Sequence, residues 1–432
     1  MPSLTFRLIL TGCALVAATT SLAITQARLG SPLFFALTAL MGACYLTMLV
    51  SVWDARAERR LLLVAFLVGT ACRVPLALGP VNYDSDMIRY IWDGRVQRFG
   101  INPYSVIPSE PSVAHTHTAD TVRMPSRHDR TPYPPAAQLF FRAIVTISEA
   151  PLTMKLALLL CDLGAILFLW QWLRATGRNE WLALAYAWNP LVILEGAHSS
   201  HIDILGTLWI IASAYWLARR RTALSAVAFT LAVATKLVPL VLAPLFLGRI
   251  RIRDIALGVG LLGALYLPFA FGSTVPVGAV PNVIEHIRFN SPIFRPLAWV
   301  ITPRGAAMFA LAVGFGAAIW ARWKLSATDP AAWAWPMALV LACAPVIYPW
   351  YLLYITPFLV SRATLPLTVW TFTAIPVYIV WERARMGARW RVPNELMVVE
   401  FGLVLLAMVT LAIAARASTV RRDETQIANA EI

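Results

Sequence analysis

Six charged side chains are concentrated in one short stretch of a chain of which only 13% of residues are charged. The stretch Tyr83–Tyr104 reads YDSDMIRYIWDGRVQRFGINPY and opens a long polar loop after an apolar span. In a helix, residues spaced i, i+3, i+4 and i+7 share one face, which here would carry Asp86, Arg89, Tyr90 and Asp93. The opposite face, with Met87, Ile88 and Ile91, is suited to lie against a membrane domain. This arrangement predicts a site at a membrane surface.

Two carboxylates are candidates for a general base in this stretch. Asp84 or Ser85 is suited to cap the helix by accepting from a free backbone N–H. Asp86 would then lie in the first turn, where the positive end of the helix dipole keeps a carboxylate ionised. An ionised carboxylate at a cleft can accept a proton from an attacking hydroxyl. The spacing alone leaves open which of Asp84 and Asp86 has this role.

Three polar residues follow an apolar segment at His198, His201 and Asp203. Ionisable residues at membrane depth are costly and suggest function, so we expect contact with substrate or phosphate. A structural role and a metal site are the alternatives. Lys236 interrupts an apolar run next to Pro239, and we expect it to bind a phosphate where the helix breaks; snorkelling to the interface is the alternative.

The elements that must position these residues are transmembrane helices. The chain is 59% hydrophobic with a mean hydropathy of +0.68, and many runs approach the roughly 20 apolar residues of a bilayer span. We therefore predict an all-α, polytopic membrane bundle of about 12–14 transmembrane helices. The expected parts are N-terminal helices at 1–79, an extracytoplasmic loop with amphipathic helices at 80–151, a bundle at 152–416, and a disordered cytoplasmic tail at 417–432.

The net charge of +14 is explained by membrane topology and does not indicate nucleic-acid binding. Arginines gather in short loops between spans, as at Arg56–Arg60, Arg219–Arg221 and Arg249–Arg253, which is typical of cytoplasmic loops. This orientation places residues 80–151 and a second outer loop, about 273–300 with Arg288 and Arg295, outside the cytoplasm. The arginine-rich segment 382–391 also falls outside. Either the span count is off by one there, or these arginines bind an anionic ligand.

Two further patterns carry no chemistry. Gly258, Gly260 and Gly263 spell GxGxxG but lie inside an apolar span with no preceding strand, so they predict no dinucleotide site. The five cysteines are scattered through apolar spans and are expected to be buried thiols, without metal or disulfide roles.

Taken together, the motifs resemble those of the GT-C class of glycosyltransferases, specifically bacterial polyprenol-phosphate-mannose mannosyltransferases. The resemblance covers most of the chain to about residue 360. It rests on DMIRY at Asp86–Tyr90, WDGR at Trp92–Arg95, NPY at Asn102–Tyr104, YPP at Tyr133–Pro135, Glu195 through His198 to HID at His201–Asp203, KLVP at Lys236–Pro239 and PWY at Pro349–Tyr351.

This resemblance implies an inverting transfer of a sugar, by default mannose, from a polyprenyl-phosphate donor. Asp86 would deprotonate a hydroxyl of an envelope glycan or glycolipid, on the outer side of the plasma membrane. Met87 departs from relatives that carry adjacent acids, which again leaves Asp84 in question. No cofactor is required by the sequence, and a divalent metal is compatible with it. The donor phosphate would be bound among Arg89, Tyr90, Asp93, His198, His201, Asp203, Lys236, Arg288 and Arg295. A flippase or transporter of lipid-linked saccharide is the alternative.

Overall fold

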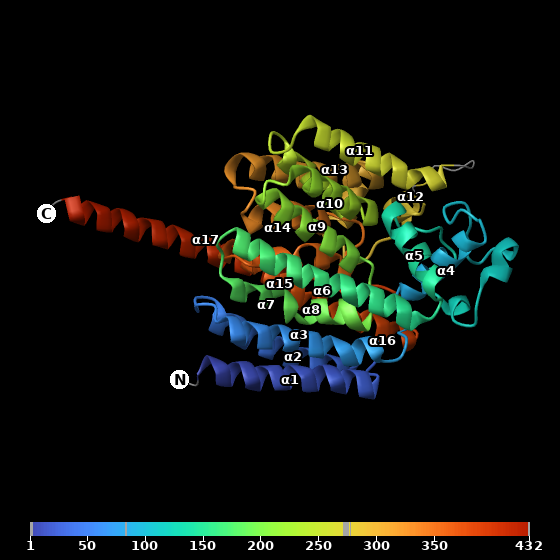
Figure 1. Cartoon of the computed structure of the whole chain (residues 1–432), viewed down its shortest axis with the longest axis horizontal. Helices are drawn as coiled ribbons and strands as arrows, with labels where there is room; N and C mark the ends of the chain where they lie inside the picture. The colour runs from blue at the N-terminus through green and yellow to red at the C-terminus, as the bar shows by residue number, and fades with distance from the viewer. Residues whose placement is uncertain (1–2, 83, 271–275, 277, 431–432) are drawn as a thin grey trace.

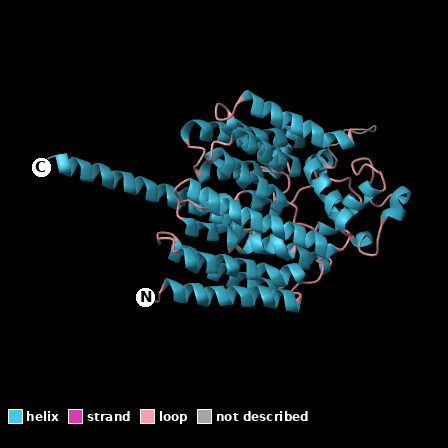
Figure 2. Ribbon diagram, viewed as in Figure 1, coloured by secondary structure: helices cyan, strands magenta, loops and turns pink. Residues whose placement is uncertain are grey.

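The computed structural model describes residues 3–82, 84–270, 276 and 278–430, with side chains described up to residue 416. All regular elements in these ranges are helical, apart from one isolated bridge between Phe289 and Val346 (Figure 2). Tyr83 and parts of the expected second outer loop, residues 273–275 and 277, lie outside the described residues. The predicted all-α bundle is confirmed.

Within the described ranges, eight helical stretches are long and apolar enough to cross a membrane (Figure 1). They are α1 (Leu4–Thr25), α2 (Pro32–Val52), α3 (Arg59–Leu78), α6 (Pro151–Ala175), α11 (Ile252–Tyr266) with its following turn, α13 (Phe294–Lys324), the stretch Arg362–Arg385, and α17 (Asn394–Ala430). Shorter apolar helices complete the bundle: α9 (Asp203–Ala218), α10 (Thr222–Thr235) and α14 (Pro330–Ala342). The bundle is therefore polytopic, although fewer of its crossings are continuous helices than the sequence suggested.

Prolines divide several crossings into short pieces. The run after Asn179 contains α7 (Leu184–Ala187), α8 (Pro190–Ile193) and a π-helical turn, Leu194–His198. The predicted break near Lys236 is confirmed, because α10 ends at Thr235 and a 3-10 run follows at Val238–Phe246. Proline cannot donate to the helical hydrogen-bond ladder, so these interruptions follow directly from the sequence. They leave polar residues at helix ends inside the bundle.

The C-terminal third is divided in the same way. Three-residue to six-residue 3-10 pieces cover Pro349–Tyr354, Thr356–Phe358, Arg362–Thr364 and Ile375–Tyr378, alongside α15 (Leu365–Thr373) and α16 (Ile379–Arg385). In α13, Ile301 and Thr302 leave helical geometry immediately before Pro303. Finally, α17 continues as a helix to Ala430, whereas the sequence predicted a disordered tail from residue 417.

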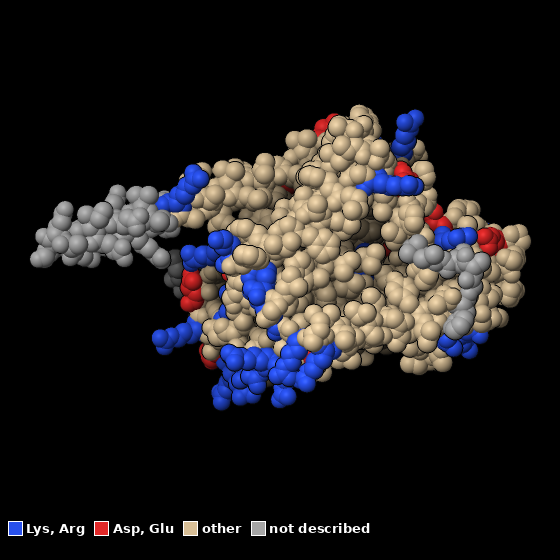
Figure 3. Space-filling model, turned by 90° about the horizontal axis from the view of Figure 1, so that it is seen from above, with Lys and Arg blue, Asp and Glu red and all other residues tan. Residues whose placement is uncertain are grey.

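The two ends of the bundle differ in charge. Lysine and arginine side chains gather at the end from which α17 projects (Figure 3). The opposite end carries the long loop with α4 (Met87–Arg98), α5 (Pro135–Ile147) and α12 (Val280–His286) (Figure 1). Arg385 forms an ion pair with Asp84, 2.5 Å apart. Segment 382–391 therefore lies at the loop end, and its arginines do not result from a miscounted span.

The long loop is a packed unit, as its aromatic residues predicted. Trp92, Tyr104, Tyr133 and Phe141 are all buried. The expected two-faced surface helix is wrong for α4, however, because both of its faces are covered. Gly94 makes this possible: a Cβ there would lie 2.5 Å from the carbonyl oxygen of Phe141 on α5. The close approach of α4 and α5 therefore depends on a residue without a side chain.

Candidate functional site

A cleft of about 380 Å³ lies where the start of α4 meets the segments around residues 346–351 and 381–390. Its volume falls in the range of roughly 300–1,000 Å³ typical of small-molecule sites. One wall carries charged residues and the other aromatic ones. Its lining includes Asp84, Asp86, Arg89, Ser126, Asp129, Arg130, Tyr133, Lys236, Tyr348, Trp350, Tyr351, Trp381 and Trp390.

Asp86 is the N-cap residue of α4, so the helix begins one or two positions later in the chain than expected, and the Asp86 side chain makes no capping hydrogen bond. Ser85 takes that role instead, because its Oγ accepts from the Met87 N–H at 3.2 Å. Among the described residues no ion pair holds the Asp86 carboxylate, whereas Asp84 is held by Arg385. Of the two acids, Asp86 is thus the one placed to interact with a ligand in the cleft.

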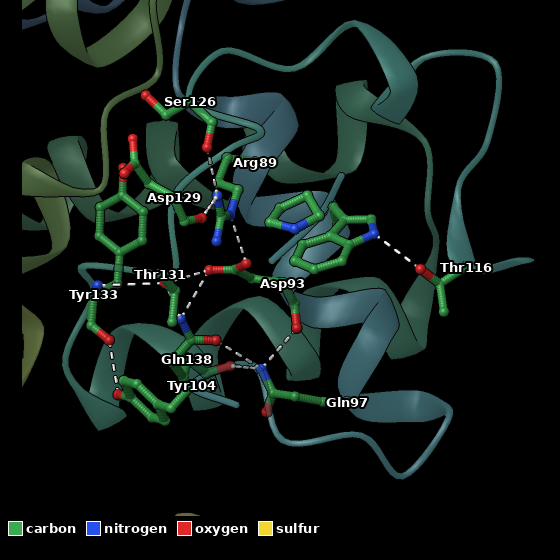
Figure 4. A network of polar contacts seen from close by, with 12 residues as sticks. Arg89, Asp93, Gln97, Tyr104, Thr116, Ser126, Asp129, Thr131, Tyr133 and Gln138 are labelled. Carbon is green, nitrogen blue, oxygen red and sulfur yellow. Dashed lines mark hydrogen bonds and ion pairs between the residues drawn. The ribbon is translucent and has the colours of Figure 1, made fainter. Parts of the chain in front are cut away.

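Arg89 lies in the charged wall and is fixed there by hydrogen bonds within the loop (Figure 4). Its Nε donates to Asp93 at 2.8 Å, and its Nη1 donates to the carbonyls of Ser126 and Asp129 at 3.1 and 3.0 Å. The remaining nitrogen, Nη2, is buried and has no hydrogen-bond partner among the described residues. Since a buried unpaired guanidinium N–H is costly, this atom is suited to an anionic oxygen of a ligand.

Asp93 lies beneath Arg89 and away from the cleft. It is fully buried and accepts hydrogen bonds from Thr131 Oγ1 at 2.6 Å and Gln138 Nε2 at 2.9 Å, in addition to Arg89 (Figure 4). These contacts satisfy the carboxylate within the loop. Asp93 does not line the cleft, so the expected substrate contact does not agree with its position. Asp93 instead orients Arg89 and joins α4 to α5.

Lys236 reaches the cleft from the break between α10 and the 3-10 run. Its Nζ lies 2.5 Å from Asp203 Oδ1 and 3.5 Å from the centre of the Tyr351 ring. The Asp203 side chain is almost fully buried, whereas Lys236 retains 18% exposure. The lysine can therefore present its charge to a ligand while Asp203 fixes its position.

His201 is held by groups on both sides. Its Nδ1 lies 2.6 Å from Glu195 Oε2, and its ring stacks on Trp350 at 4.0 Å. Tyr378 donates to the other Glu195 oxygen. The Nε2 atom of His201 is buried and unpartnered among the described residues. His201 thus supports the aromatic wall from behind rather than lining the cleft.

His198 lies apart from His201. It lines a smaller cavity with Asp84 and Gly79. The expected contact of His198 with substrate or phosphate therefore does not lie in the cleft with Asp86. The π-helical turn at Leu194–His198 directs the two histidines differently.

Tyr90 and Tyr133 connect the loop to the bundle. The Tyr90 hydroxyl accepts from the Ile202 N–H at 3.2 Å, and its ring stacks on Phe141 at 4.5 Å. Burial, with a further contribution from the negative charge of Asp86, raises the pKa of both tyrosines well above the ordinary value. Both therefore remain neutral. Tyr90 positions the loop, and Tyr133 lines the cleft beside Asp86.

The expected roles of Arg288 and Arg295 in the cleft do not agree with their positions. Arg288 donates to the carbonyls at the end of α12, including Ile284 at 2.9 Å and Ile287 at 2.7 Å. It therefore satisfies free helix carbonyls. The Arg295 guanidinium lies 5.9 Å from the Trp299 ring, on an exposed part of α13. Neither residue lines the cleft.

Several residues of the site were not predicted from the sequence. Arg130 and Trp390 line the cleft, and Glu195 supports His201. Arg130 and Trp390 lie in irregular segments, so no helical spacing could have assigned them.

Within the bundle, Arg73 and Asp162 form a fully buried ion pair, 2.5 Å apart. In the sequence, the signal for this pair was a charged residue inside each of two apolar spans.

No three His, Cys, Asp or Glu side chains converge as a metal-ligand set in the part of the chain that the structure describes. A larger, apolar groove of about 910 Å³ runs between α2 and α17 on the outer surface of the bundle, with Arg383 and Glu395 as its charged lining residues. It lies apart from Asp86, and we assign it no chemistry.

Comparison with known proteins identifies the family. The model of the alpha-(1->6)-mannopyranosyltransferase N-terminal domain family matches residues 10–252, which is more than half of the chain. The chain belongs to this family. It is accordingly a glycosyltransferase, of a mannosyltransferase family, built as a multi-pass membrane protein. No curated protein and no solved structure matches the chain.

The matched region of this mannosyltransferase family member covers the charged wall of the cleft, including Asp86, Arg89 and Lys236. The aromatic wall, from Tyr348 to Trp390, lies beyond residue 252. The two walls therefore come from different parts of the chain. The fold brings them together through contacts such as that of Lys236 with Tyr351.

Proposed function

We propose that this glycosyltransferase moves mannose from a polyprenyl-phosphate donor to a hydroxyl of an envelope glycan or glycolipid. The transfer occurs at the extracytoplasmic surface with inversion, and Asp86 is the general base. The observation that carries this proposal is the position of the Asp86 carboxylate in one cleft with three cations, Arg89, Arg130 and Lys236. A carboxylate for the acceptor and cations for a leaving phosphate are what the reaction needs.

The proposed step balances around the anomeric carbon. Asp86 takes the proton of the acceptor hydroxyl, and the acceptor oxygen forms a bond to the anomeric carbon. The bond from that carbon to the phosphate oxygen breaks, and polyprenyl phosphate leaves with the electron pair. Arg89 Nη2 and Lys236 Nζ stabilise the negative charge that develops on the leaving phosphate.

The charge distribution supports the proposed side of the membrane. The arginine-rich end of the bundle is expected to face the cytoplasm, and the cleft lies at the opposite end with α4 and α5 (Figures 1 and 3). Polyprenyl-phosphate sugar would then enter from the bilayer. The cations of the cleft contribute positive charge for the leaving phosphate, and a divalent metal is compatible with this step.

The test compares two carboxylate variants of the purified full-length protein. We expect Asp86→Asn to reduce mannose transfer from polyprenyl-phosphate mannose by about 10²–10⁴-fold, as loss of a general base does. Asp84→Asn should retain most activity, since an exposed ion pair such as Asp84–Arg385 contributes roughly 0–1 kcal/mol. Full activity in Asp86→Asn would refute the assignment. Movement of lipid-linked sugar across vesicles, without transfer, would instead support a flippase.

A further inference from the structure

The aromatic wall is the part of the cleft for which the transfer step gives no role. It consists of Tyr348, Trp350, Tyr351, Trp381 and Trp390, all of which line the cleft. Trp390 is 48% exposed, whereas Trp350 and Trp381 are each 6% exposed. A tryptophan left half-exposed on a binding cleft, in a wall that is otherwise packed, indicates a surface that a ligand covers.

The wall is held rigid from behind. Tyr348 and Trp350 stack at 4.4 Å with their planes 5° apart, and His201 stacks on the other face of the pair at 4.0 Å from Trp350. Trp381 and Trp390 meet edge to face at 4.7 Å, and Phe289 lies 4.4 Å from Tyr348. Rigid aromatic side chains provide contact area at little entropic cost. These neighbours cover most of the ring faces in the wall, and Trp390 is its largely exposed ring.

A pyranose ring matches this surface chemically. One face of such a ring presents C–H bonds whose partial positive charge is attracted to the negative face of an aromatic ring. Its hydroxyl groups point outward from the ring edge and need polar partners. The same cleft supplies such a partner in the Asp129 carboxylate. An isoprenoid chain has no polar group that would pair with this carboxylate.

We propose that the aromatic wall, with Trp390 at its exposed edge, is a subsite that stacks a sugar ring of the acceptor glycan. This proposal rests on the proposed function, because it places the acceptor in the same cleft as the cations that bind the donor phosphate. A ring bound on this wall presents its hydroxyl toward Asp86. Trp390 then determines acceptor specificity rather than donor binding.

The experiment separates acceptor binding from catalysis. Full-length protein in nanodiscs carries Trp390→Ala, Trp390→Phe or Trp323→Ala; Trp323 is 79% exposed on α13 and does not line the cleft. We expect Trp390→Ala to raise the KM for α-1,6-linked mannotriose by about tenfold and to leave the donor KM unchanged. Trp390→Phe should keep most of the affinity, because it keeps a ring face, and Trp323→Ala should behave as wild type.

Calorimetric titration of mannotriose into the Asp86→Asn protein tests the subsite without turnover. Binding that is lost when Trp390→Ala is added supports the subsite. Equal mannotriose binding with and without Trp390, or an effect of Trp390→Ala on the donor KM alone, would overturn it. If Asp86→Asn remained fully active while Trp390→Ala still weakened mannotriose binding, the proposed base would be wrong and the subsite would stand.

Discussion

At the residue scale, one side chain has two functions. Arg89 uses three of its N–H contacts to hold Asp93 and the carbonyls of Ser126 and Asp129, and it leaves Nη2 without a partner. A simple deletion of Arg89 therefore confounds two effects. It leaves the buried Asp93 carboxylate without its ion pair. It also removes the N–H group that we propose donates to the phosphate.

A pair of variants separates these effects. Arg89→Met should lower the local stability of the loop by about 3–5 kcal/mol, because it leaves a buried charge unpaired. Adding Asp93→Leu should recover part of that stability, since replacing both partners of a buried pair by apolar groups is often neutral. Hydrogen exchange of the α4 amides reports the stability. Transfer activity should stay low in both variants; its return in the double variant would mean that Arg89 acts only through the fold.

At the element scale, the site depends on how closely α4 and α5 approach. Thr131 and Gln138 reach Asp93 only because the two helices are in contact, and Gly94 is the point of contact. The helix pair in turn meets the bundle through Tyr90 and the Ile202 N–H. A small displacement of α4 would therefore move Asp86 and Arg89 together.

Gly94→Ala tests this dependence. The added methyl would lie 2.5 Å from the Phe141 carbonyl, and forcing packed elements apart costs roughly 1–3 kcal/mol. We expect reduced transfer and faster hydrogen exchange in both α4 and α5. Gly260→Ala on α11 is the matched control, because nothing lies within 4 Å of its added Cβ. Normal activity in Gly94→Ala would show that the helix contact does not position the site.

At the scale of the whole molecule, the charge distribution predicts the orientation in the membrane. Arginines gather at the end of the bundle opposite the cleft (Figure 3). The exception, segment 382–391, lies beside the cleft because Arg385 binds Asp84. The positive-inside rule therefore predicts the cytoplasm at the end from which α17 projects.

Cysteine labelling checks this orientation. In a background without the five native cysteines, His128→Cys and Arg389→Cys should react with a membrane-impermeant maleimide on intact cells. Arg56→Cys and Arg253→Cys should react only after the membrane is opened. All four positions are exposed in the structure. Labelling of His128→Cys only in opened cells would place the cleft on the cytoplasmic side and refute the proposed topology.

The parts of the structure that depend on local sequence were predictable. The spans, the break at Lys236 and the helix beginning near Asp86 follow from apolar length and proline. The roles of Asp93 and Arg288 were not, because their partners are set by packing. The Asp93 carboxylate accepts hydrogen bonds from Thr131 and Gln138, which lie 38 and 45 positions away in the chain.

The charged wall and the aromatic wall illustrate the same distinction. Residues of the charged wall stand out in an apolar sequence, whereas Trp390 is one of 17 tryptophans and looks like an interfacial anchor. Only the fold brings it into one cleft with Asp86. A charged residue in an apolar chain can be recognised from the local sequence. Whether an aromatic residue lines a cleft depends on the fold and cannot be recognised in this way.

The Arg385–Asp84 ion pair joins residues separated by 301 positions, which has a consequence for biosynthesis. Ribosomes extend a chain at about 5–20 residues per second, so the acidic loop leaves the insertion machinery many seconds before its partner arginine exists. During that interval the charged residues of the cleft lack the aromatic residues that line it with them. The cleft is therefore complete only when the last helices enter the bilayer.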